Sequence, residues 1–364
     1  MTSVGDILEL AYGKALKAAD RDGGEYPVVG SSGIVGAHSK GLTGDPTIVV
    51  GRKGSIGSVT WIDGPAWPID TAYFVRPVRN DLDLRWLYWL LRSLRMETMN
   101  KSAAVPGLNR DDVYRLAIAV PPLPEQRRIA AILDHADALR TQRRETLAHL
   151  DSLAISTFTE FFGAPSTWHD RWPKTTVGNL ATSVDYGTSG KSGATGEWAI
   201  LRMGNVTDDG RIDLSELKYI DLQPNEVAKY TVRAGDLLFN RTNSREKVGK
   251  SAVVRTGDPL ALAGYLIRVR FKNPHVAEYV SAYLRSEHGK ATRLRLAKAA
   301  VNQANINATE MRGIALPDPP DELIVRFADT LASVELRRSE ALKSAEALDE
   351  LFTSLQSRAF RGEL

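Results

Sequence analysis

Basic side chains occupy matching turns in two distant parts of the chain. The candidates are Arg52, Lys53 and Ser55 in the first turn and Arg241, Arg245, Lys247 and Lys250 in the second. Arginine commonly pairs with the edge of guanine in the major groove, whereas lysine and arginine on phosphates set the register of a protein on DNA. These turns are therefore candidates for DNA contact. The alternative for each is a solvated loop or a local salt bridge.

A third basic stretch follows later in the chain. The segment 284–300, "LRSEHGKATRLRLAKAA", carries five basic residues, Arg293 and Arg295 among them, against the single acid Glu287. Such a run is often only a solvated helix face, and the net charge of +3 for the whole chain is weak support for a nucleic-acid partner. If DNA binds, we expect Arg293 and Arg295 to contact phosphates.

Catalytic motifs are missing from the sequence. The glycine-rich stretches at 29–36 and 51–57 do not fit the dinucleotide-binding spacing, and "SREKVGKS" lacks the first glycine of a phosphate loop. Neither a nucleophile elbow nor an H-E-x-x-H zinc motif occurs. The six histidines lie far apart and there is no cysteine. We expect no catalytic residues and no metal site in this chain.

The chain contains an internal repeat whose order is preserved throughout. "SVGDILELAYGK" from residue 3 matches "TVGNLATSVDYGTS" from 176, and "TIVVGRKGSIGSVTW" from 47 matches "DLLFNRTNSREKVGKSAVV" from 236. "DTAYFVRP" from 70 matches "LAGYLIRV" from 262, and "SAAVPGLNRDDVYRLAIAVPPLPEQ" from 102 matches "KAAVNQANINATEMRGIALPDPPDE" from 298. One structural unit is therefore expected twice.

Each copy is predicted to be a mixed, mostly antiparallel β domain. Short β-branched and aromatic runs such as "TIVVG", "TAYFVRP" and "YLIRVRF" are separated by Gly, Asp and Asn turns, which is typical of strands. A short helix, "DLRWLYWLLRSL", interrupts them. Its Trp86 and Trp89 could stack on bases, but the leucines beside them favour a place in the core.

Each copy ends in prolines followed by a long helix. Pro121, Pro122 and Pro124 form a stiff lead-in, after which a helix can begin at Glu125. Apolar residues then recur in alternating steps of three and four, at 129–157 in the first copy and 324–355 in the second. Arg143 and Arg338 interrupt these two seams, and we predict that they are equivalent positions of the repeat.

The two seams are predicted to cover each other. A seam of this length is unstable in water, and an antiparallel pair of the two helices would relate the copies by an approximate two-fold axis. We therefore predict an α+β fold with two mixed, mostly β domains separated by two long helices that form an antiparallel coiled coil. The predicted division is 1–122, 123–163 for the central helix, 164–317, and 318–364 for the C-terminal helix.

Composition narrows the class of protein. The chain of 364 residues is 43% hydrophobic and 25% charged, as expected for a globular protein with two domains. The absence of cysteine fits a reducing compartment. No signal peptide and no apolar run of about 20 residues occurs, so we expect a cytoplasmic protein without a membrane partner.

The sequence resembles the specificity (S) subunits of Type I restriction-modification systems. The resemblance rests on "GLNRDDVYRLAIAVPPLPEQRRIAAIL" at 107–133, on "VVGRKGSIGSVTW" with "WPIDTAYFV", on the duplicated plan, and on "SLQSRAFRGEL" at the end. It covers essentially the whole chain, and the 107–133 motif is specific. The second copy departs from it, because "NQANINATEM" replaces "GLNRDDV" and "DPPDELIVRFA" replaces "LPEQRRIAA".

The resemblance implies a DNA-recognition subunit without catalytic activity. In this family each target-recognition domain reads one half of a bipartite sequence in double-stranded DNA, and the two helices hold the halves apart. Two methyltransferase (M) subunits dock on the helical region to methylate adenine, and restriction (R) subunits can join them. S-adenosylmethionine, ATP and magnesium would then belong to the partners, with no cofactor in this chain.

Two other functions stay open on the sequence alone. One is a scaffold or adaptor in which the coiled coil is the functional surface and the two copies bind protein without DNA specificity. The other is a fragment of a fused methyltransferase-nuclease, which the lack of catalytic motifs disfavours.

Overall fold

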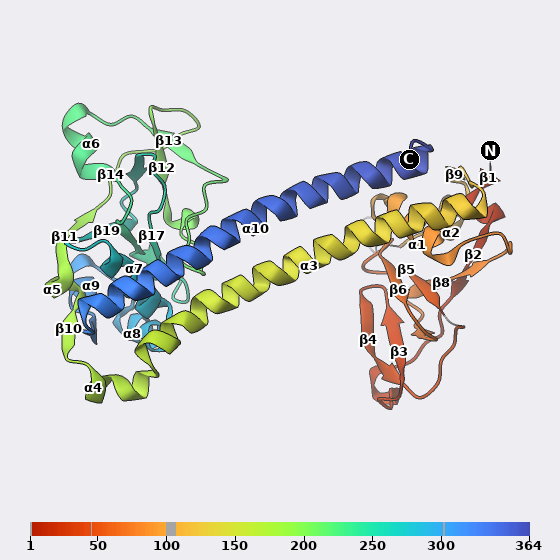
Figure 1. Cartoon of the computed structure of the whole chain (residues 1–364), viewed down its shortest axis with the longest axis horizontal. Coiled ribbons are helices and arrows are strands. Elements are labelled where there is room, and N and C mark those ends of the chain that lie inside the picture. Colours follow the sequence, from red (N-terminus) through yellow and green to blue (C-terminus); the bar gives the residue numbers. More distant parts are fainter. Residues whose placement is uncertain (1, 45, 100–106, 301–302) are drawn as a thin grey trace. The chain divides into compact units, whose positions relative to one another are not determined.

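The computed structural model describes residues 2–44, 46–99, 107–300 and 303–364. It divides into two compact units (Figure 1). The first unit comprises residues 1–146 and 341–364, and the second comprises residues 147–340. Each unit therefore contains one mixed domain together with a segment of each long helix.

The main sheet has the same strand order in both units. In the first unit the order is β2 (Leu8–Tyr12), β8 (Ala72–Pro77), β5 (Thr47–Gly51) and β6 (Val59–Ile62), with every neighbouring pair antiparallel. In the second unit it is β11 (Ala181–Tyr186), β19 (Leu266–Phe271), β15 (Leu237–Asn240) and β17 (Ser251–Val253), again antiparallel throughout. These matched sheets confirm the internal repeat.

A smaller sheet also recurs. β3 (Tyr26–Gly30) lies between antiparallel β4 (Gly33–His38) and parallel β7 (Trp67–Pro68). β12 (Trp198–Leu201) lies in the same way between β13 (Lys218–Ile220) and β18 (Leu260–Leu262), and β14 (Thr231–Val232) adds a strand. The remaining strands are β1 (Thr2–Ser3) with β9 (Ala117–Ile118), β10 (Lys174–Thr176) with β22 (Ala315–Pro317), and β16 (Thr242–Asn243) with β21 (Gln303–Asn305) and β20 (Lys298–Ala300).

Helices and short 3-10 turns complete the two units. The first unit holds α1 (Leu84–Ser93), α2 (Arg110–Tyr114), and 3-10 turns at Val4–Asp6, Ala18–Asp20 and Met96–Thr98. The second holds α4 (Trp168–Arg171), α5 (Val177–Leu180), α6 (Pro224–Tyr230), α7 (His275–Arg285), α8 (Glu287–Leu296), α9 (Ala308–Arg312), and 3-10 turns at Pro165–Thr167 and Met203–Asn205. The long helices are α3 (Leu123–Phe162) and α10 (Asp321–Arg361).

The long helix α3 starts within the proline-rich lead-in, two residues before Glu125. α3 begins at Leu123, so Pro124 occupies its first turn, where the missing N–H of proline costs nothing. Gln126 is fully buried there. Its side chain accepts from the Asp83 amide at 2.8 Å and donates to the carbonyls of Asp81 and Pro121 at 3.0 and 2.9 Å, which ties the start of α3 to the start of α1.

Within each unit, segments of α3 and α10 pack antiparallel. In the first unit Ile129, Leu133 and Ala136 of α3 share a core with Phe352 and Ala359 of α10. Trp86 and Trp89 of α1 are fully buried in the same core, which confirms their predicted place. Trp89 lies 5.4 Å, centroid to centroid, from Phe352.

The second unit buries the other ends of the same helices. Phe158 and Phe162 of α3 contact Phe327 of α10, with ring centroids 5.9 and 5.1 Å apart. Leu331 and Val334 extend this core. Opposite ends of the two helices thus supply the cores of the two units.

The seam predicted for the second copy is confirmed, but that of the first copy is wrong by one residue in places. Leu139 and Leu153, predicted inside it, are 37% and 45% exposed, whereas Leu133 and Ala154 are buried. The stretch "RIAAILDHADAL" carries apolar residues on adjacent positions, so steps of three and four fit more than one stripe. Tertiary packing selects among them.

The equivalence of Arg143 with Arg338 is also corrected. The Arg140 guanidinium lies 2.5 Å from the Asp349 carboxylate in the first unit, and that of Arg338 lies 2.7 Å from Asp151 in the second. Arg140 and Arg338 stand at the same distance from the starts of their helices, as do Asp151 and Asp349. The two helices therefore repeat one pattern of arginine and aspartate.

Among the described residues, no helix is both long enough and apolar enough to cross a lipid bilayer.

The aromatic cluster at the helix junction generates a stability prediction. Phe327→Ala removes a side chain with no exposed surface that contacts three phenylalanine rings. We expect it to lower the free energy of unfolding of the second unit by about 3–5 kcal/mol. Leu336→Ala, on the same helix at a position 63% exposed, should change it by less than about 0.5 kcal/mol. Denaturant titration of both variants checks this, and equal effects would contradict it.

Candidate nucleic-acid interface

The turn that follows β5 presents the first group of predicted residues. Gly51 and Gly57 shape this turn, because a Cβ at Gly51 would lie 2.1 Å from the Ser55 carbonyl oxygen, and Gly57 has φ +70° with backbone atoms 2.4 Å from where a Cβ would stand. This glycine-rich stretch is thus a tight connection between β5 and β6. Lys53 and Ser55 lie exposed on it.

Arg52 is held at the base of the same turn. Its guanidinium carbon lies 4.8 Å from the ring centroid of Tyr12 and 5.8 Å from that of Tyr73, and its Nη1 donates to the Asp70 carbonyl at 3.0 Å. The backbone is fixed on both sides, since the Arg52 amide donates to Thr71 at 2.9 Å and its carbonyl accepts from Leu108 at 2.8 Å. Arg52 is therefore preorganised rather than free in solvent.

Tyr73 anchors this arrangement from below. It is buried, and its hydroxyl donates to the Leu108 carbonyl at 3.1 Å. Burial raises the pKa of the Tyr73 phenol. It stays a neutral donor at physiological pH.

Arg241 occupies the equivalent place in the second unit. Its guanidinium carbon lies 4.7 Å from the ring centroid of Tyr186, its amide donates to the Tyr265 carbonyl at 3.0 Å, and its carbonyl accepts from Ile306 at 2.9 Å. Tyr12 and Tyr186 each end the first strand of their main sheet. The two units therefore place an arginine on a tyrosine ring at the same edge of the same sheet.

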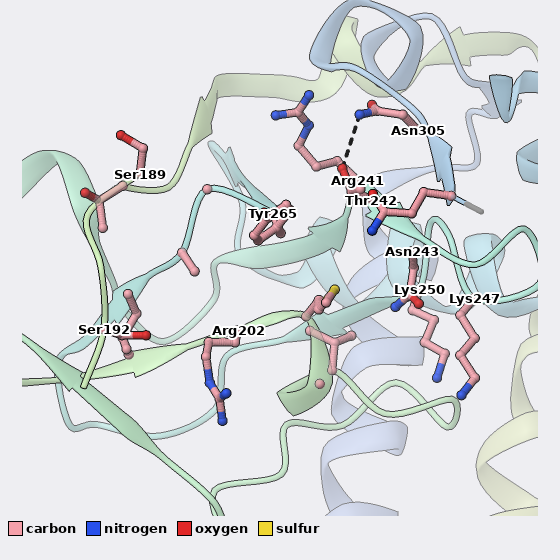
Figure 2. A pocket seen from close by; sticks show the side chains of 18 of the residues that line it. Ser189, Ser192, Arg202, Arg241, Thr242, Asn243, Lys247, Lys250, Tyr265 and Asn305 are labelled. Carbon is pink, nitrogen blue, oxygen red and sulfur yellow. Dashed lines mark hydrogen bonds between the residues drawn. The ribbon is translucent and has the colours of Figure 1, made fainter. Parts of the chain in front are cut away.

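A cavity of about 990 Å³ opens beside Arg241 in the second unit (Figure 2). Its polar lining comes from loops and from the short strands β16 and β21, and includes Ser189, Ser192, Arg202, Glu216, Thr242, Asn243, Lys247, Lys250, Gln303 and Asn305. The Asn305 amide donates to the Thr242 hydroxyl at 3.2 Å, across the pairing of β16 with β21. The lining thus combines cationic side chains with side-chain amides. Glu216 is the one acidic residue among the described residues that line the cavity.

The three predicted residues that follow Arg241 differ in their surroundings. Arg245 and Lys247 are exposed, and Lys247 lines the cavity. Lys250 is 12% exposed, and its Nζ lies 2.7 Å from the exposed carboxylate of Asp208. Lys247 and Lys250 extend side by side in Figure 2. Arg245 and Lys247 are the more accessible cations.

Arg293 and Arg295, from the basic stretch 284–300, have different environments in the structure. Arg295 is exposed and donates to the Thr292 hydroxyl at 3.2 Å. Arg293 is 7% exposed, donates to the Val248 carbonyl at 2.9 Å, and passes beneath Gly249. Burial lowers the pKa of Arg293 to about 10. This geometry corrects the expectation of a phosphate contact at Arg293, because its guanidinium supports the 244–250 turn from inside.

Sequence reasoning missed several residues of the site. Tyr12 and Tyr186 stand at matched positions of the repeat, and that match could have marked them. Gln303 and Asn305 have a weaker signal, because "NQANIN" departs from the first copy, and Asn243 lies in a turn whose basic residues are the more obvious candidates. Among the described residues, no group of three or more histidine or acidic side chains is placed to hold a metal ion.

The chain is similar in sequence and in fold to known proteins. Residues 1–149 match the model of the Type I restriction modification DNA specificity domain. The first part of the chain is therefore similar to the DNA specificity domain of Type I restriction-modification systems. It is 29% identical over 167 residues to the MjaX specificity subunit of Methanocaldococcus jannaschii and 23% identical over 290 residues to the EcoKI specificity subunit of Escherichia coli.

These similarities cover the chains unequally. They span 45% and 74% of this chain but only 39% and 62% of the two relatives. The crystal structure of a Type I S subunit from M. genitalium aligns over 98% of this chain and 95% of its own length, with a TM-score of 0.69 at 16% identity. The specificity-subunit fold is therefore shared over the full length.

The buried position of Arg293 leads to a prediction. Arg293→Ala should destabilise the second unit by about 1–3 kcal/mol, because the Val248 carbonyl loses its donor and a void opens under Gly249. Arg295→Ala, two residues away and exposed, should leave stability unchanged. Thermal unfolding of the two variants checks the contrast. A stable Arg293→Ala protein would show that the side chain does not support the turn.

Proposed function

We propose that this chain is the DNA-recognition subunit of a Type I restriction-modification complex, without catalytic activity of its own. Each unit would read one half of a bipartite target in double-stranded DNA. The observation that carries this proposal is the recurrence of one arginine-on-tyrosine corner, Arg52 on Tyr12 and Arg241 on Tyr186, once in each unit. Two equivalent reading surfaces in one chain suit a target in two parts.

The chemistry of the corners fits duplex DNA. Arginine can donate two parallel hydrogen bonds to O6 and N7 of guanine, and asparagine or glutamine can do so to adenine. The cavity of the second unit brings Arg241 together with Asn243, Gln303 and Asn305. The exposed cations Lys53, Arg245 and Arg295 would contact phosphates and set register.

The long helices supply the proposed partner surface and spacer. α3 and α10 each contribute segments to both units, so their length would set the spacing between half-sites. Leu153 of α3 and Leu351 of α10 are 45% and 50% exposed and stand at the same distance from the starts of their helices. A matched pair of apolar positions supports the docking of two identical methyltransferase subunits, which restriction subunits could join.

Cofactors would then reside on the partners. We assign S-adenosylmethionine to the methyltransferase subunits, and ATP and magnesium to the restriction subunits. Because its substrate is the cell's own and incoming DNA, the complex would act in the cytoplasm.

A scaffold that binds only proteins is the competing function. It would not explain why an arginine placed on a tyrosine ring recurs at the same sheet edge in both units. A DNA reader loses affinity steeply as salt rises, because bound phosphates release counterions. A protein scaffold has no such dependence on duplex DNA.

Mapping modified adenines by single-molecule sequencing tests the function directly. With the gene intact we expect methylation at one bipartite motif, and with the gene deleted we expect that motif to lose it. Deletion of a gene unrelated to DNA methylation serves as the control for effects of the deletion procedure on growth. An unchanged map in the deletion strain would contradict the proposal.

Replacing Lys247, an exposed lysine that lines the cavity, gives a quantitative test of whether it would contact phosphate. Lys247→Ala should weaken binding about equally on target and unrelated duplexes and should reduce the slope of log affinity against log salt by about one. Lys229→Ala, in α6 and outside the cavity lining, is the matched control and should leave the slope unchanged. A slope that Lys247→Ala does not alter would remove this residue from the interface.

A further inference from the structure

The tyrosine at the corner of the first unit holds two arginines. The guanidinium carbon of Arg52 lies 4.8 Å from the ring centroid of Tyr12, and that of Arg110 lies 4.9 Å from the same centroid. Tyr12 is 51% exposed, so this group lies at the surface. Arg110 belongs to a different element, α2, which brings the second cation to the ring from a distant part of the sequence.

Hydrogen bonds from two backbone amides hold together the elements that carry these three residues. The Leu10 amide in β2 donates to the Tyr114 hydroxyl at 2.8 Å, which ties α2 to the strand that carries Tyr12. The Leu108 amide donates to the Arg52 carbonyl at 2.8 Å, which ties the turn to the start of α2. The two arginines are therefore positioned by the fold rather than by flexible loops.

The charges of this group are not neutralised within the described part of the chain. Among the described residues, no ion pair is found between a carboxylate and Arg52 or Arg110, whereas the Arg85 guanidinium lies 2.7 Å from the Asp134 carboxylate. Two guanidinium groups on one ring repel each other, and a cation at the first position of a helix opposes the helix dipole. Helix stability does not account for Arg110, but an anionic or acceptor-rich partner would.

The second unit keeps the tyrosine and lacks the second arginine. Among the described residues, Arg241 is the cation found over the Tyr186 ring, and Ala308 opens α9 where Arg110 opens α2. The Ala308 amide instead donates to the Tyr186 hydroxyl at 2.9 Å. The two units thus share a positioning tyrosine and differ in the cations it holds.

We infer that Tyr12 and Tyr186 are matched positioning residues for the reading arginines, and that Arg110 is a further specificity-determining residue for the half-site read by the first unit. The acceptor edge of guanine, O6 with N7, is the group that a preorganised arginine recognises best. Stacking on the tyrosine orients the guanidinium plane and leaves its N–H edge available. This inference rests on the proposed DNA-reading function.

Half-site preference tests it in the full chain bound to its methyltransferase partner. Binding is measured on the mapped bipartite duplex and on duplexes altered in one half only, including 7-deazaguanine in place of single guanines. Arg110→Ala should lower the preference for the unaltered first half-site roughly tenfold. It should also abolish the sensitivity to one 7-deazaguanine, and leave the second half-site unaffected. The variant should fold, because the second unit already has alanine at this place.

The tyrosines are tested by matched variants. Tyr12→Leu should lower preference at the first half-site about threefold to tenfold, Tyr12→Phe should retain it, and Tyr186→Leu should act only on the second half-site. If Tyr12 had only a structural role, Tyr12→Leu would lower the melting temperature and the binding preference at both half-sites together. That result would overturn the inference, because rescue by phenylalanine would then reflect packing alone.

The outcomes distinguish a failure of the inference about Arg110 and Tyr12 from a failure of the proposed function. If the unaltered chain prefers the mapped duplex but Arg110→Ala and Tyr12→Leu leave half-site preference unchanged, the inference is overturned and the proposed function stands. An equal loss on target and unrelated DNA would make Arg110 a phosphate contact and would likewise overturn it. If the unaltered chain prefers no bipartite duplex, both fall.

Discussion

An apolar stripe along a forty-residue helix is unstable in water, and the way this stripe is covered determines the architecture of the protein. Each end of α3 is covered by the opposite end of α10, together with the helix that packs beside the main sheet. The ion pairs Arg140 with Asp349 and Arg338 with Asp151 fix the register of the two helices, because a shift by one turn would separate both. Neither mixed domain has a complete core without this pairing.

The duplicated sheets show which parts of the unit are constrained and which are variable. Strand order, the parallel pair in the smaller sheet and the hydrogen bonds around Arg52 and Arg241 are the same in both units. The side chains that meet beyond the strand ends differ. At one equivalent antiparallel backbone pairing, the first unit has Lys53 opposite Gly107, whereas the second has Thr242 opposite Asn305, whose side chains are hydrogen-bonded. Because the strands are the same and the residues beyond their ends differ, one fold presents two different surfaces.

Repeats and periodicity were sufficient to predict the α+β class, the two long helices and the paired turns, since these depend on local spacing. The phase of the first seam was not predictable, because "IAAIL" offers apolar residues on neighbouring positions and only packing against Phe352 and Trp89 selects among them. The inward turn of Arg293 was equally hidden, since an alternating basic run does not reveal which member lies beneath Gly249. The stacking of Arg110 on Tyr12 joins residues about a hundred positions apart, and no local pattern encodes it.

The shared helices also impose an order on folding during synthesis. Residues 147–340 form the second unit from one continuous stretch of chain, whereas the first unit needs residues 341–364, which the ribosome makes after the second unit. Domains ordinarily fold in the order of their synthesis, from the N-terminus. Here the N-terminal domain must wait with Trp86, Trp89 and Ile129 incompletely covered until Phe352 and Ala359 emerge. Its dependence on chaperones and its susceptibility to truncation should therefore exceed those of the domain that follows it.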